Sequence, residues 1–395
     1  MNDEEVGDSM RRFQRLRVLS LLHAGKLPNS IGSLTQLWYI NLSESSEHRL
    51  SETVCTLHNL RILILRGCKN LVELPTNLMN LTNLYHLDIK GTRLQQMTPQ
   101  MGKLSKLQTL TGFFVGKQNG SSMKGIGELK CLEGKLRIWM PQNVVDAQDA
   151  IGANLEGMEA LRKLDLRWSN DSYGSLDEHV LHQLKPNVNV HCLVIVGYGG
   201  SRFSALLTGP FLVDLRLSEC HCSFLPPLGQ LAYLKILLIK EFDKVESVGC
   251  EFYGNCTSTS IAFKPLESLT FEGMPQWCEW IPNVAESEEK AFSRLQVLCI
   301  SEGPKLKKSL PGHLHSLKEL AVTKRSQFVL SLPRPTTINK MSLKDSSNDH
   351  PHMVKLETLT SGGHSLIVQS CYSLDSLLKE MEHLRYFHHM REPKG

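Results

Sequence analysis

Leucine recurs in this chain at spacings that are clearest between residues 60 and 84. Eight leucines and one cysteine hold the repeating positions there: Leu60, Leu63, Leu65, Cys68, Leu71, Leu74, Leu78, Leu81 and Leu84. The two-residue step from Leu63 to Leu65 is the spacing of side chains on one face of a strand. The stretch therefore predicts a short strand with inward-pointing leucines, followed by a turn that buries the other leucines.

The same arrangement repeats on both sides of this stretch. Its first leucine falls at Leu16, Leu37, Leu60, Leu84 and Leu107, at spacings of 21, 23, 24 and 23 residues. The positions match L-x-x-L-x-L-x-x-N/C-x-L, the leucine-rich repeat, whose copies span roughly 20–29 residues. One copy cannot bury its leucines alone, whereas stacked copies can. We therefore predict an α/β fold: a curved leucine-rich-repeat solenoid with a parallel β-sheet on its concave face and turns and short helices on its convex face.

One strand is expected in each repeat, at its inward-facing apolar pair. The expected strands lie at residues 19–21, 40–42, 63–65, 87–89, 164–166, 193–195, 215–217, 237–239, 269–271, 298–300 and 320–322. A helix is also expected before the strand at 164–166. Its apolar residues recur at helical spacing: Val144, Ala147, Ala150, Ile151 and Leu155.

The regularity of the pattern divides the chain into six segments. These are a polar N-terminal tail (1–15), regular repeats (16–112), a loop insertion (113–135), irregular repeats (136–324), an irregular segment (325–362) and a last repeat with the C-terminal tail (363–395). The last repeat is assigned from Leu366, Val368, Cys371, Leu374 and Leu377. A short amphipathic helix at 374–384 is the alternative there.

Composition and charge set limits on the function. The net charge of +4 over 395 residues is too small to indicate nucleic-acid binding by the whole chain. No stretch approaches the ~20 apolar residues that span a bilayer, and the first residues do not resemble a signal peptide. The eleven cysteines, as at Cys68, Cys220 and Cys371, mostly hold positions where the repeat takes a small apolar residue. We expect reduced core thiols, which fits a cytoplasmic protein.

The outward-facing strand positions are the candidate binding site, because they form one continuous surface on a solenoid. They mix aromatic, aliphatic and oppositely charged side chains, which suits protein recognition. The candidate residues are Tyr39, Asn41, Ile62, Ile64, Arg66, His86, Asp88, Lys90, Lys163, Asp165, Arg167, Arg216, Lys240 and Glu272. Any curved surface of this kind would show such a mixture, so the assignment to binding depends on the fold.

Two tryptophans, Trp277 and Trp280, stand three residues apart just after an expected strand. Exposed tryptophans would be interface anchors, since tryptophan is enriched in binding hot spots. The preferred interpretation is that they pack at the rim of the solenoid and cover the insertion before Phe263, because large aromatic side chains are usually mostly buried.

Neither a metal site nor an active site is expected. Cys220-His221-Cys222 has the residue types of a zinc site, but no second ligand pair stands nearby, so a structural role is preferred. The sequence contains no nucleophile elbow, no H-E-x-x-H and no glycine-rich loop between a strand and a helix. Gly125 and Gly127 are assigned to turns.

Three stretches are more specific than the leucine spacing. They are LQTLTGFFVGKQNG with the following GIGELKCLEGKLRI, then NVVDAQDAIGANLEGMEALRKLDLRW, and then LPPLGQLAYLKILLI with the downstream LESLTFEGMPQWCEW. With these stretches, residues 16–324 resemble the leucine-rich-repeat region of plant intracellular immune receptors, which combine a coiled coil, a nucleotide-binding (NB-ARC) domain and leucine-rich repeats.

This resemblance implies a sensor region that binds pathogen effectors or guarded host proteins and restrains the receptor's nucleotide-binding domain. It implies protein partners, no nucleic acid, and a location in the cytoplasm with the nucleus as a second site. The sequence has no G-x-x-x-x-G-K-[ST] phosphate loop, and the coiled coil is missing too. No cofactor is therefore expected, because ATP or ADP would require the absent nucleotide-binding domain.

Two other functions stay open at this point. The chain could be a stand-alone decoy, a scaffold or a truncated remnant without signalling activity. An extracellular receptor ectodomain is less favoured, because the turns read LPNSIG and LPTNLM rather than L-x-G-x-I-P.

Overall fold

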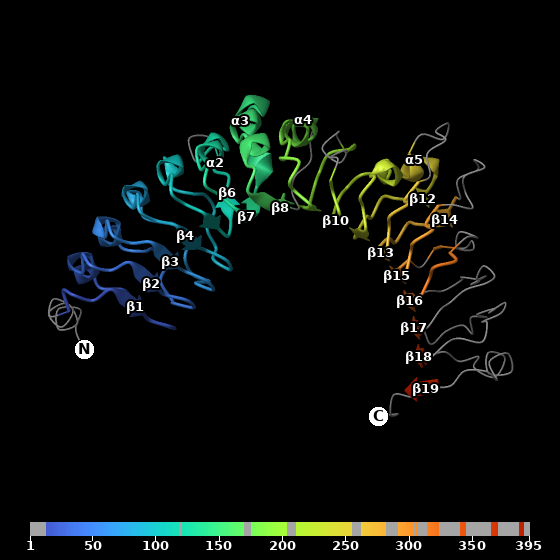
Figure 1. The fold of residues 1–395 in the computed structure, drawn as a ribbon, viewed down its shortest axis with the longest axis horizontal. Coiled ribbons are helices and arrows are strands. Elements are labelled where there is room, and N and C mark those ends of the chain that lie inside the picture. Colours follow the sequence, from blue (N-terminus) through green and yellow to red (C-terminus); the bar gives the residue numbers. More distant parts are fainter. Residues whose placement is uncertain are drawn as a thin grey trace. The chain divides into compact units, whose positions relative to one another are not determined.

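The computed structural model consists of two compact units, unit 1 (Met1–Leu193) and unit 2 (Val194–Gly395). Most of unit 1 and the first half of unit 2 are described in detail. The described residues are 13–117, 121–169, 175–203, 211–254, 262–281, 291–303, 305–306, 314–323, 340–344, 365–369 and 387–390. The strand β9 (Cys192–Val196) contains the division between the units. In each unit, successive strands lie side by side on one face of the solenoid, as predicted from the sequence (Figure 1).

Unit 1 begins with five short parallel strands in sequence order. They are β1 (Val18–Ser20), β2 (Tyr39–Asn41), β3 (Ile62–Ile64), β4 (His86–Asp88) and β5 (Thr109–Leu110). Their central residues align in one row across the sheet: Leu19, Ile40, Leu63, Leu87 and Leu110. Leu19 is half-buried and the other four are fully buried. The two-residue spacing of the leucines therefore correctly predicted which strand residues point inward.

The turns between these strands carry short helices on the other side of the coil (Figure 1). The 3₁₀ helices are η1 (Asn29–Ser33), η2 (Glu52–Thr56), η3 (Leu78–Asn80) and η4 (Met101–Lys103). Each one buries an apolar side chain of the repeat, for example Ile31 in η1 and Leu78 in η3. The cysteine position of the repeat is also buried, and the Cys68 thiol donates to the Leu42 carbonyl at 3.1 Å.

The remainder of unit 1 contains α-helices and further strands, two of them longer than β1 to β5. The strands are β6 (Phe113–Phe114), β7 (Gly134–Trp139) and β8 (Leu161–Arg167), and β7 pairs in parallel with both neighbours. The helices are α2 (Lys124–Gly127), η5 (Pro141–Asn143), α3 (Ala147–Gly152), η6 (Leu155–Gly157) and α4 (Ser175–Gln183). The expected helix is therefore present as α3, although it is shorter than predicted and leaves Ile151 exposed.

The loop insertion predicted at 113–135 is wrong in part, because the segment contributes ordered elements to the repeat. Phe113 and Phe114 form β6, and both side chains are buried. The helix α2 follows, with Ile126 buried, and β7 begins at Gly134. Glycine and serine in this segment obscured the pattern, since Gly125 and Gly127 lie in α2 and not in turns.

Unit 2 continues with parallel strands. They are β10 (Asp214–Ser218), β11 (Ile236–Lys240), β13 (Ser268–Glu272), β15 (Val297–Ser301), β16 (Glu319–Thr323), β17 (Lys340–Lys344), β18 (Ser365–Gln369) and β19 (Phe387–Met390). A separate pair, β12 (Ser247–Val248) with β14 (Glu279–Trp280), lies outside this row, and the helices are η8 (Leu228–Gln230) and α5 (Cys250–Tyr253). The inward rows start at Leu215 and Leu217 and stay apolar through β16.

Two predictions near the C-terminus agree only in part with the structure. The segment 325–362, predicted as irregular, contains β17, which pairs in register with β16. The predicted last repeat has its strand at β18, which includes Leu366 and Val368. Cys371, Leu374 and Leu377 lie outside the described residues, and so does the alternative helix at 374–384. No helix among the described residues is long and apolar enough to cross a bilayer.

Candidate functional site

The strand face is the surface formed by the outward-pointing residues of the parallel strands and by the residues directly after each strand. Its outward rows alternate with the buried ones, for example Tyr39, Ile62 and His86 across β2, β3 and β4. Twelve of the fourteen candidate residues are half-exposed or exposed: Tyr39, Asn41, Ile62, Ile64, Arg66, His86, Lys90, Lys163, Arg167, Arg216, Lys240 and Glu272. Within unit 1 and within unit 2, the structure thus brings the predicted residues onto one surface.

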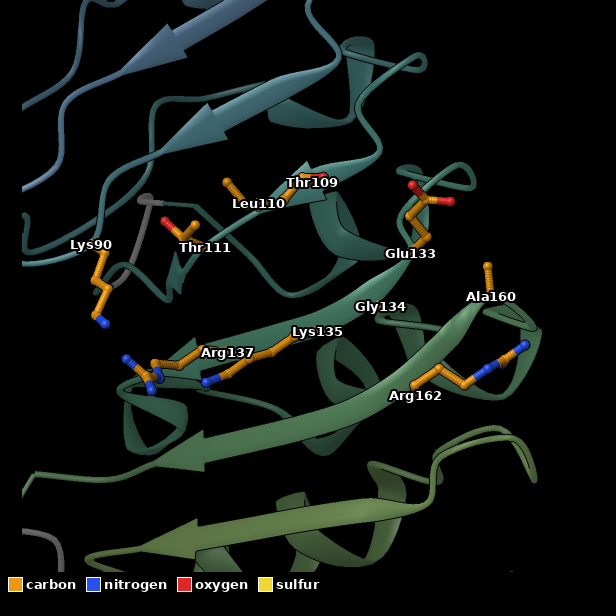
Figure 2. Close-up of a pocket in the computed structure, with 10 residues that line it drawn as sticks. All are labelled: Lys90, Thr109, Leu110, Thr111, Glu133, Gly134, Lys135, Arg137, Ala160 and Arg162. Carbon is orange, nitrogen blue, oxygen red and sulfur yellow. The ribbon is translucent and has the colours of Figure 1, made fainter. Parts of the chain in front are cut away.

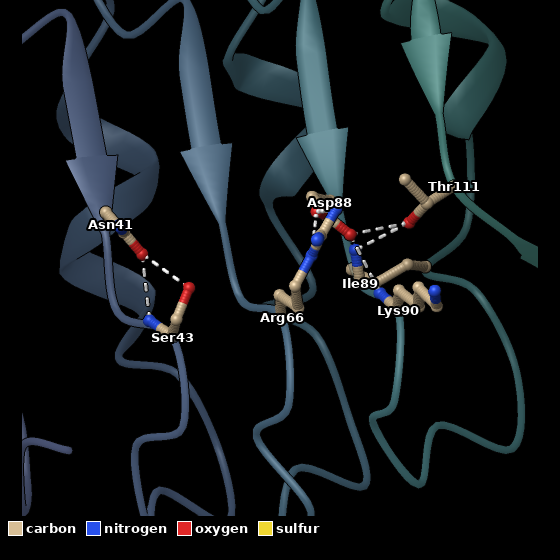
Figure 3. Close-up of polar contacts among 7 residues, drawn as sticks. All are labelled: Asn41, Ser43, Arg66, Asp88, Ile89, Lys90 and Thr111. Carbon is tan, nitrogen blue, oxygen red and sulfur yellow. Dashed lines mark hydrogen bonds and ion pairs between the residues drawn. The ribbon is translucent and has the colours of Figure 1, made fainter. Parts of the chain in front are cut away.

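Asp88 is an exception, because its carboxylate is buried and fully used by its neighbours (Figure 3). Oδ2 accepts a hydrogen bond from Nε of Arg66 at 2.8 Å, and Nη2 of the same guanidinium lies 2.8 Å from it in an ion pair. Oδ1 accepts from the Thr111 hydroxyl and from the Lys90 amide, both at 3.0 Å. The prediction that Asp88 presents an outward charge is therefore wrong: it holds the turn after β4 and orients Arg66.

Asn41 occupies the equivalent position two strands earlier and also closes its own turn. Its Oδ1 accepts from the amide and the hydroxyl of Ser43, at 2.9 and 2.6 Å (Figure 3). Ile64, between them in the same row, has no polar group to contribute. Two polar residues of this row, Asn41 and Asp88, therefore accept hydrogen bonds from the backbone of the adjacent turn, as short polar side chains often do.

Asp165 is the second exception, and it too is buried. Its carboxylate accepts from Arg137 Nε at 2.7 Å and from Arg167 Nε at 2.8 Å, and Lys135 Nζ lies 3.5 Å away. Burial alone would raise the pKa of Asp165, but the hydrogen bonds and charges of the two arginines outweigh it and the pKa is lowered. Asp165 is thus an internal counter-ion, and the prediction that it is available to a partner is wrong.

Three strand-face residues of β7 were not among the predicted site: Lys135, Arg137 and Trp139. The guanidinium carbons of Arg137 and Arg167 lie 5.6 and 5.3 Å from the Trp139 ring centroid. The ring also stacks on Phe114, with 5.8 Å between centroids and 3° between planes. The alternation in GKLRIW, with Leu136 and Ile138 inward, was the signal that could have found them.

A hollow of about 650 Å³ opens between β5 and β7 in unit 1 (Figure 2). The two strands diverge there, since β5 pairs with β4 whereas β7 pairs with β6 and β8. We call this the β5–β7 hollow. Its lining residues are Lys90, Thr109, Leu110, Thr111, Glu133, Gly134, Lys135, Arg137, Ala160 and Arg162.

The strand face of unit 2 combines ion pairs with a less polar row. Lys240 Nζ lies 2.8 Å from Glu272 and 3.4 Å from Glu241, and these carboxylates raise the pKa of Lys240. The neighbouring row begins at the exposed Arg216 and continues through four half-exposed residues of low polarity: Leu238, Thr270, Cys299 and Ala321. Unit 2 therefore presents charge along one row and a largely apolar row beside it.

Trp277 and Trp280 are buried, which rules them out as exposed interface anchors in this structure. Their ring centroids lie 4.9 and 5.3 Å from the Phe271 centroid, and 5.7 Å from each other. Their indole nitrogens are also satisfied: Trp277 donates to the Glu279 carbonyl at 2.9 Å and Trp280 to the Tyr253 hydroxyl at 2.8 Å. The preferred prediction that both rings are buried by packing is confirmed, and Trp280 contacts Tyr253 in the segment before Phe263.

Cys220 and Cys222 are buried thiols that donate to backbone carbonyls. Cys220 donates to Ser218 at 3.2 Å, and Cys222 donates to Gly200 at 3.0 Å. Burial raises the pKa of Cys220, which keeps this sulfur protonated at neutral pH. The structural interpretation of the Cys-His-Cys sequence is supported by these contacts. Among the described residues, no group of three or more His, Cys, Asp or Glu is arranged to hold a metal ion.

Comparisons with known proteins agree with the repeat architecture. Residues 123–242 match the family model described as R13L1/DRL21 LRRs. A leucine-rich-repeat protein of Leptospira interrogans, LIC12759, superposes with a TM-score of 0.56 at 18% identity, covering 86% of this chain and 82% of that one. The fold is therefore that of a leucine-rich-repeat solenoid, with an α/β architecture.

Two plant proteins of Arabidopsis thaliana are similar in sequence over most of the chain. Disease resistance protein At3g14460 is 37% identical over 82% of this chain, and disease resistance RPP13-like protein 1 is 35% identical over 94%. The chain belongs to the plant disease resistance proteins and corresponds to a leucine-rich-repeat region of that family. It spans 24% of the first relative's length and 37% of the second's.

Proposed function

We propose that this chain is the protein-recognition region of an intracellular plant immune receptor, and that its strand face binds a pathogen effector or a guarded host protein. The observation that carries the proposal is the strand face itself. It displays Tyr39, His86, Lys163 and Lys240 on a scaffold whose buried rows are almost entirely apolar. Membership of the disease resistance family supports an immune role, and the mixture of aromatic, aliphatic and charged groups suits a protein ligand.

In a full-length receptor we further propose that this region restrains the nucleotide-binding domain. Binding of a partner at the strand face would favour the open state of a two-state receptor if the partner has lower affinity for the closed state. The free-energy difference between the two affinities sets how far the equilibrium can move. ATP or ADP would be bound by that other domain, and this region would act in the cytoplasm by steric and allosteric means.

The structure decides which substitutions test the proposal. Reversing the charge of Arg66 or Arg167 would also break the internal contacts to Asp88 or Asp165, so a loss of binding would be ambiguous. Tyr39 and Lys163 have no role in these two networks. Lys240 pairs with Glu272 and Glu241, but these side chains are about one third to one half exposed, and ion pairs at such sites contribute little to stability. We therefore choose Tyr39→Ala, Lys163→Glu and Lys240→Glu together as the strand-face variant. Lys103→Glu with Lys264→Glu, at exposed positions in the turns, forms the control, which changes the net charge by the same amount.

Proximity labelling in plant leaf cells tests the proposal. The chain, the strand-face variant and the control are each fused to a biotin ligase and expressed at equal abundance, with thermal unfolding measured to confirm folding. The expected result is at least one protein labelled by the wild type and the control but not by the strand-face variant. If the three sets of labelled proteins are the same, the strand face is not the recognition surface.

A further inference from the structure

The lining of the β5–β7 hollow is strongly basic. Lys90, Lys135, Arg137 and Arg162 contribute four cationic side chains, and Glu133 contributes the single acidic one. Lys90 follows β4, Lys135 and Arg137 lie on β7, and Arg162 lies at the start of β8. Residues from three different repeats therefore bring positive charge to one hollow, although Lys90 and Arg162 are far apart in the sequence.

The nearby internal carboxylates do not neutralise this charge. Asp165 is shared by Lys135, Arg137 and Arg167, so one negative charge faces three positive ones. Asp88 is occupied by Arg66. Burial, followed by repulsion from Arg137, lowers the pKa of Lys135, although Asp165 acts in the opposite direction.

Two of the four cations have no acidic partner among the described contacts. The Lys90 ammonium makes no ion pair or hydrogen bond within the described part of the chain, and its side chain is exposed. Arg162 uses Nη1 for the carbonyls of Glu159 and Leu161, at 2.7 and 3.2 Å. A carbonyl carries no formal charge, so the guanidinium charge at this end of the hollow is not compensated.

The cations lie at both ends of the hollow. In Figure 2, Lys90, Arg137 and Lys135 extend toward one end, whereas Arg162 extends toward the other, on the side where Glu133 also lies. Thr109 and Leu110 on β5 and Gly134 on β7 line the space between them. Separated positive charges with neutral surface between them match carboxylates spaced along an extended chain better than one compact polyanion. A volume of about 650 Å³ accommodates several side chains of such a chain.

We propose that the β5–β7 hollow is a docking site for an acidic segment of a protein partner, whose Asp or Glu carboxylates pair with Lys90, Lys135 and Arg162. The proposal rests on the recognition function above and specifies a partner chemistry for it. Arg137 acts as a positioning residue: Asp165 holds its Nε, and its side chain is only 17% exposed. The incoming carboxylates supply the negative charge that the hollow lacks.

A peptide array tests the proposal with the purified full chain. The array carries octapeptides with two to four Asp or Glu residues at every combination of positions in a Ser/Leu background, and the same peptides with Asn or Gln instead. The strongest acidic binder is then measured by fluorescence anisotropy in 50 and 300 mM NaCl. We expect binding of acidic peptides only, and weaker binding at the higher salt concentration, because ions screen exposed charge pairs.

The decisive variant is Lys90→Gln with Arg162→Gln, which leaves the Asp165 network untouched. We expect its affinity for the peptide to fall about tenfold, since two partly exposed ion pairs are lost. The matched control, Lys103→Gln with Lys130→Gln, has the same net charge and changes exposed lysines outside the hollow. Its affinity should stay within twofold of the wild type.

Three results would overturn the proposal: no acidic peptide binds, the decisive variant binds as tightly as the control, or inorganic tripolyphosphate binds the hollow more tightly than the best peptide. The last result would define a phosphate site. Failure here leaves the proposed function standing if the labelling experiment still finds a strand-face partner. Conversely, if labelling fails while the peptide binds, the hollow recognises acidic chains but the proposed function loses its support.

Discussion

At the scale of single residues, the strand face contains two kinds of charged side chain that sequence position alone does not distinguish. Asp88 and Asp165 occupy outward strand positions, yet they are buried and hold arginines in place. Lys90 and Lys163 stand near them on the same surface, and no carboxylate holds either one in the described structure. The first kind maintains the surface and the second kind is available to a ligand.

Asp165→Asn should lower the free energy of unfolding of unit 1 by about 3 kcal/mol at pH 7, because arginines that are 17% and 29% exposed lose their shared charge. Chemical denaturation measures this difference. Glu73→Gln is the matched control: its partner Arg49 is 72% exposed, so the cost should stay below about 1 kcal/mol. Equal losses in both variants would show that Asp165 is not a structural counter-ion.

The contribution of Asp165 should also depend on pH in one direction. Its pKa in the folded state is lowered relative to the unfolded chain, where a typical aspartate has a pKa of about 3.9. The stabilisation is therefore complete above that value and is lost as the pH falls through the folded-state pKa. The difference in stability between the wild type and Asp165→Asn should shrink below about pH 4. A difference that stays constant down to pH 2.5 would contradict this assignment.

The aromatic core of unit 2 allows a second test at this scale. Trp280→Ala removes a buried ring that packs on Phe271 and Phe292 and donates to Tyr253, so we expect a loss of about 3–5 kcal/mol. Phe224→Ala is the matched control, because Phe224 is 66% exposed and should cost less than about 0.5 kcal/mol. The measurement is the urea midpoint of unfolding for both variants. A small loss of stability in Trp280→Ala would contradict the buried position of its ring.

At the scale of elements, the segment 113–135 shows how neighbouring repeats fit together. α2 packs beside α3, and Gly127 allows this approach: a Cβ there would lie 2.1 Å from the Gly152 carbonyl oxygen and 3.2 Å from Ala153. Gly125, in the same helix, has only Phe113 within reach, at 3.8 Å. A side chain is therefore excluded at Gly127 by a close backbone contact, whereas Gly125 has room for one.

We expect Gly127→Ala to destabilise unit 1 by about 1–3 kcal/mol, since a methyl group in a tightly packed contact forces the backbone apart. Gly125→Ala should be neutral or slightly stabilising, because alanine favours the helix and the site has room. Thermal unfolding of the two variants side by side is the measurement. If both variants unfold at the wild-type temperature, the contact between α2 and α3 is looser than described.

Most strands were predictable because the spacing of inward apolar residues alone determines where they lie. The inward leucine pair placed a strand in each regular repeat, and the helical spacing around Ala147 and Ala150 located α3. The prediction failed where other residues take the leucine positions, as at Phe113 and Phe114 in β6. The site was less predictable, because whether an outward charge is free depends on neighbours 22 to 28 residues away, as for Arg66 with Asp88 and Arg137 with Asp165.

At the scale of the whole molecule, each of the two units is a stack in which successive repeats supply strands to that unit's own surface. The buried rows vary little, since each repeat must bury apolar side chains against the next. The outward rows carry no such constraint, so the polar surface of unit 1 and the less polar row of unit 2 can differ. This division of labour lets one scaffold present different surfaces to different ligands.

The central claim is that the strand face binds a protein, and its most direct test is the dissociation constant of a partner identified by labelling. We predict that binding of this purified partner weakens at least about tenfold for the variant Tyr39→Ala, Lys163→Glu and Lys240→Glu, because interface energy is concentrated in a few residues. The turn variant Lys103→Glu with Lys264→Glu, which changes the net charge equally, should bind within twofold of the wild type. Equal affinity for both variants, or a loss confined to the turn variant, would place recognition outside the strand face.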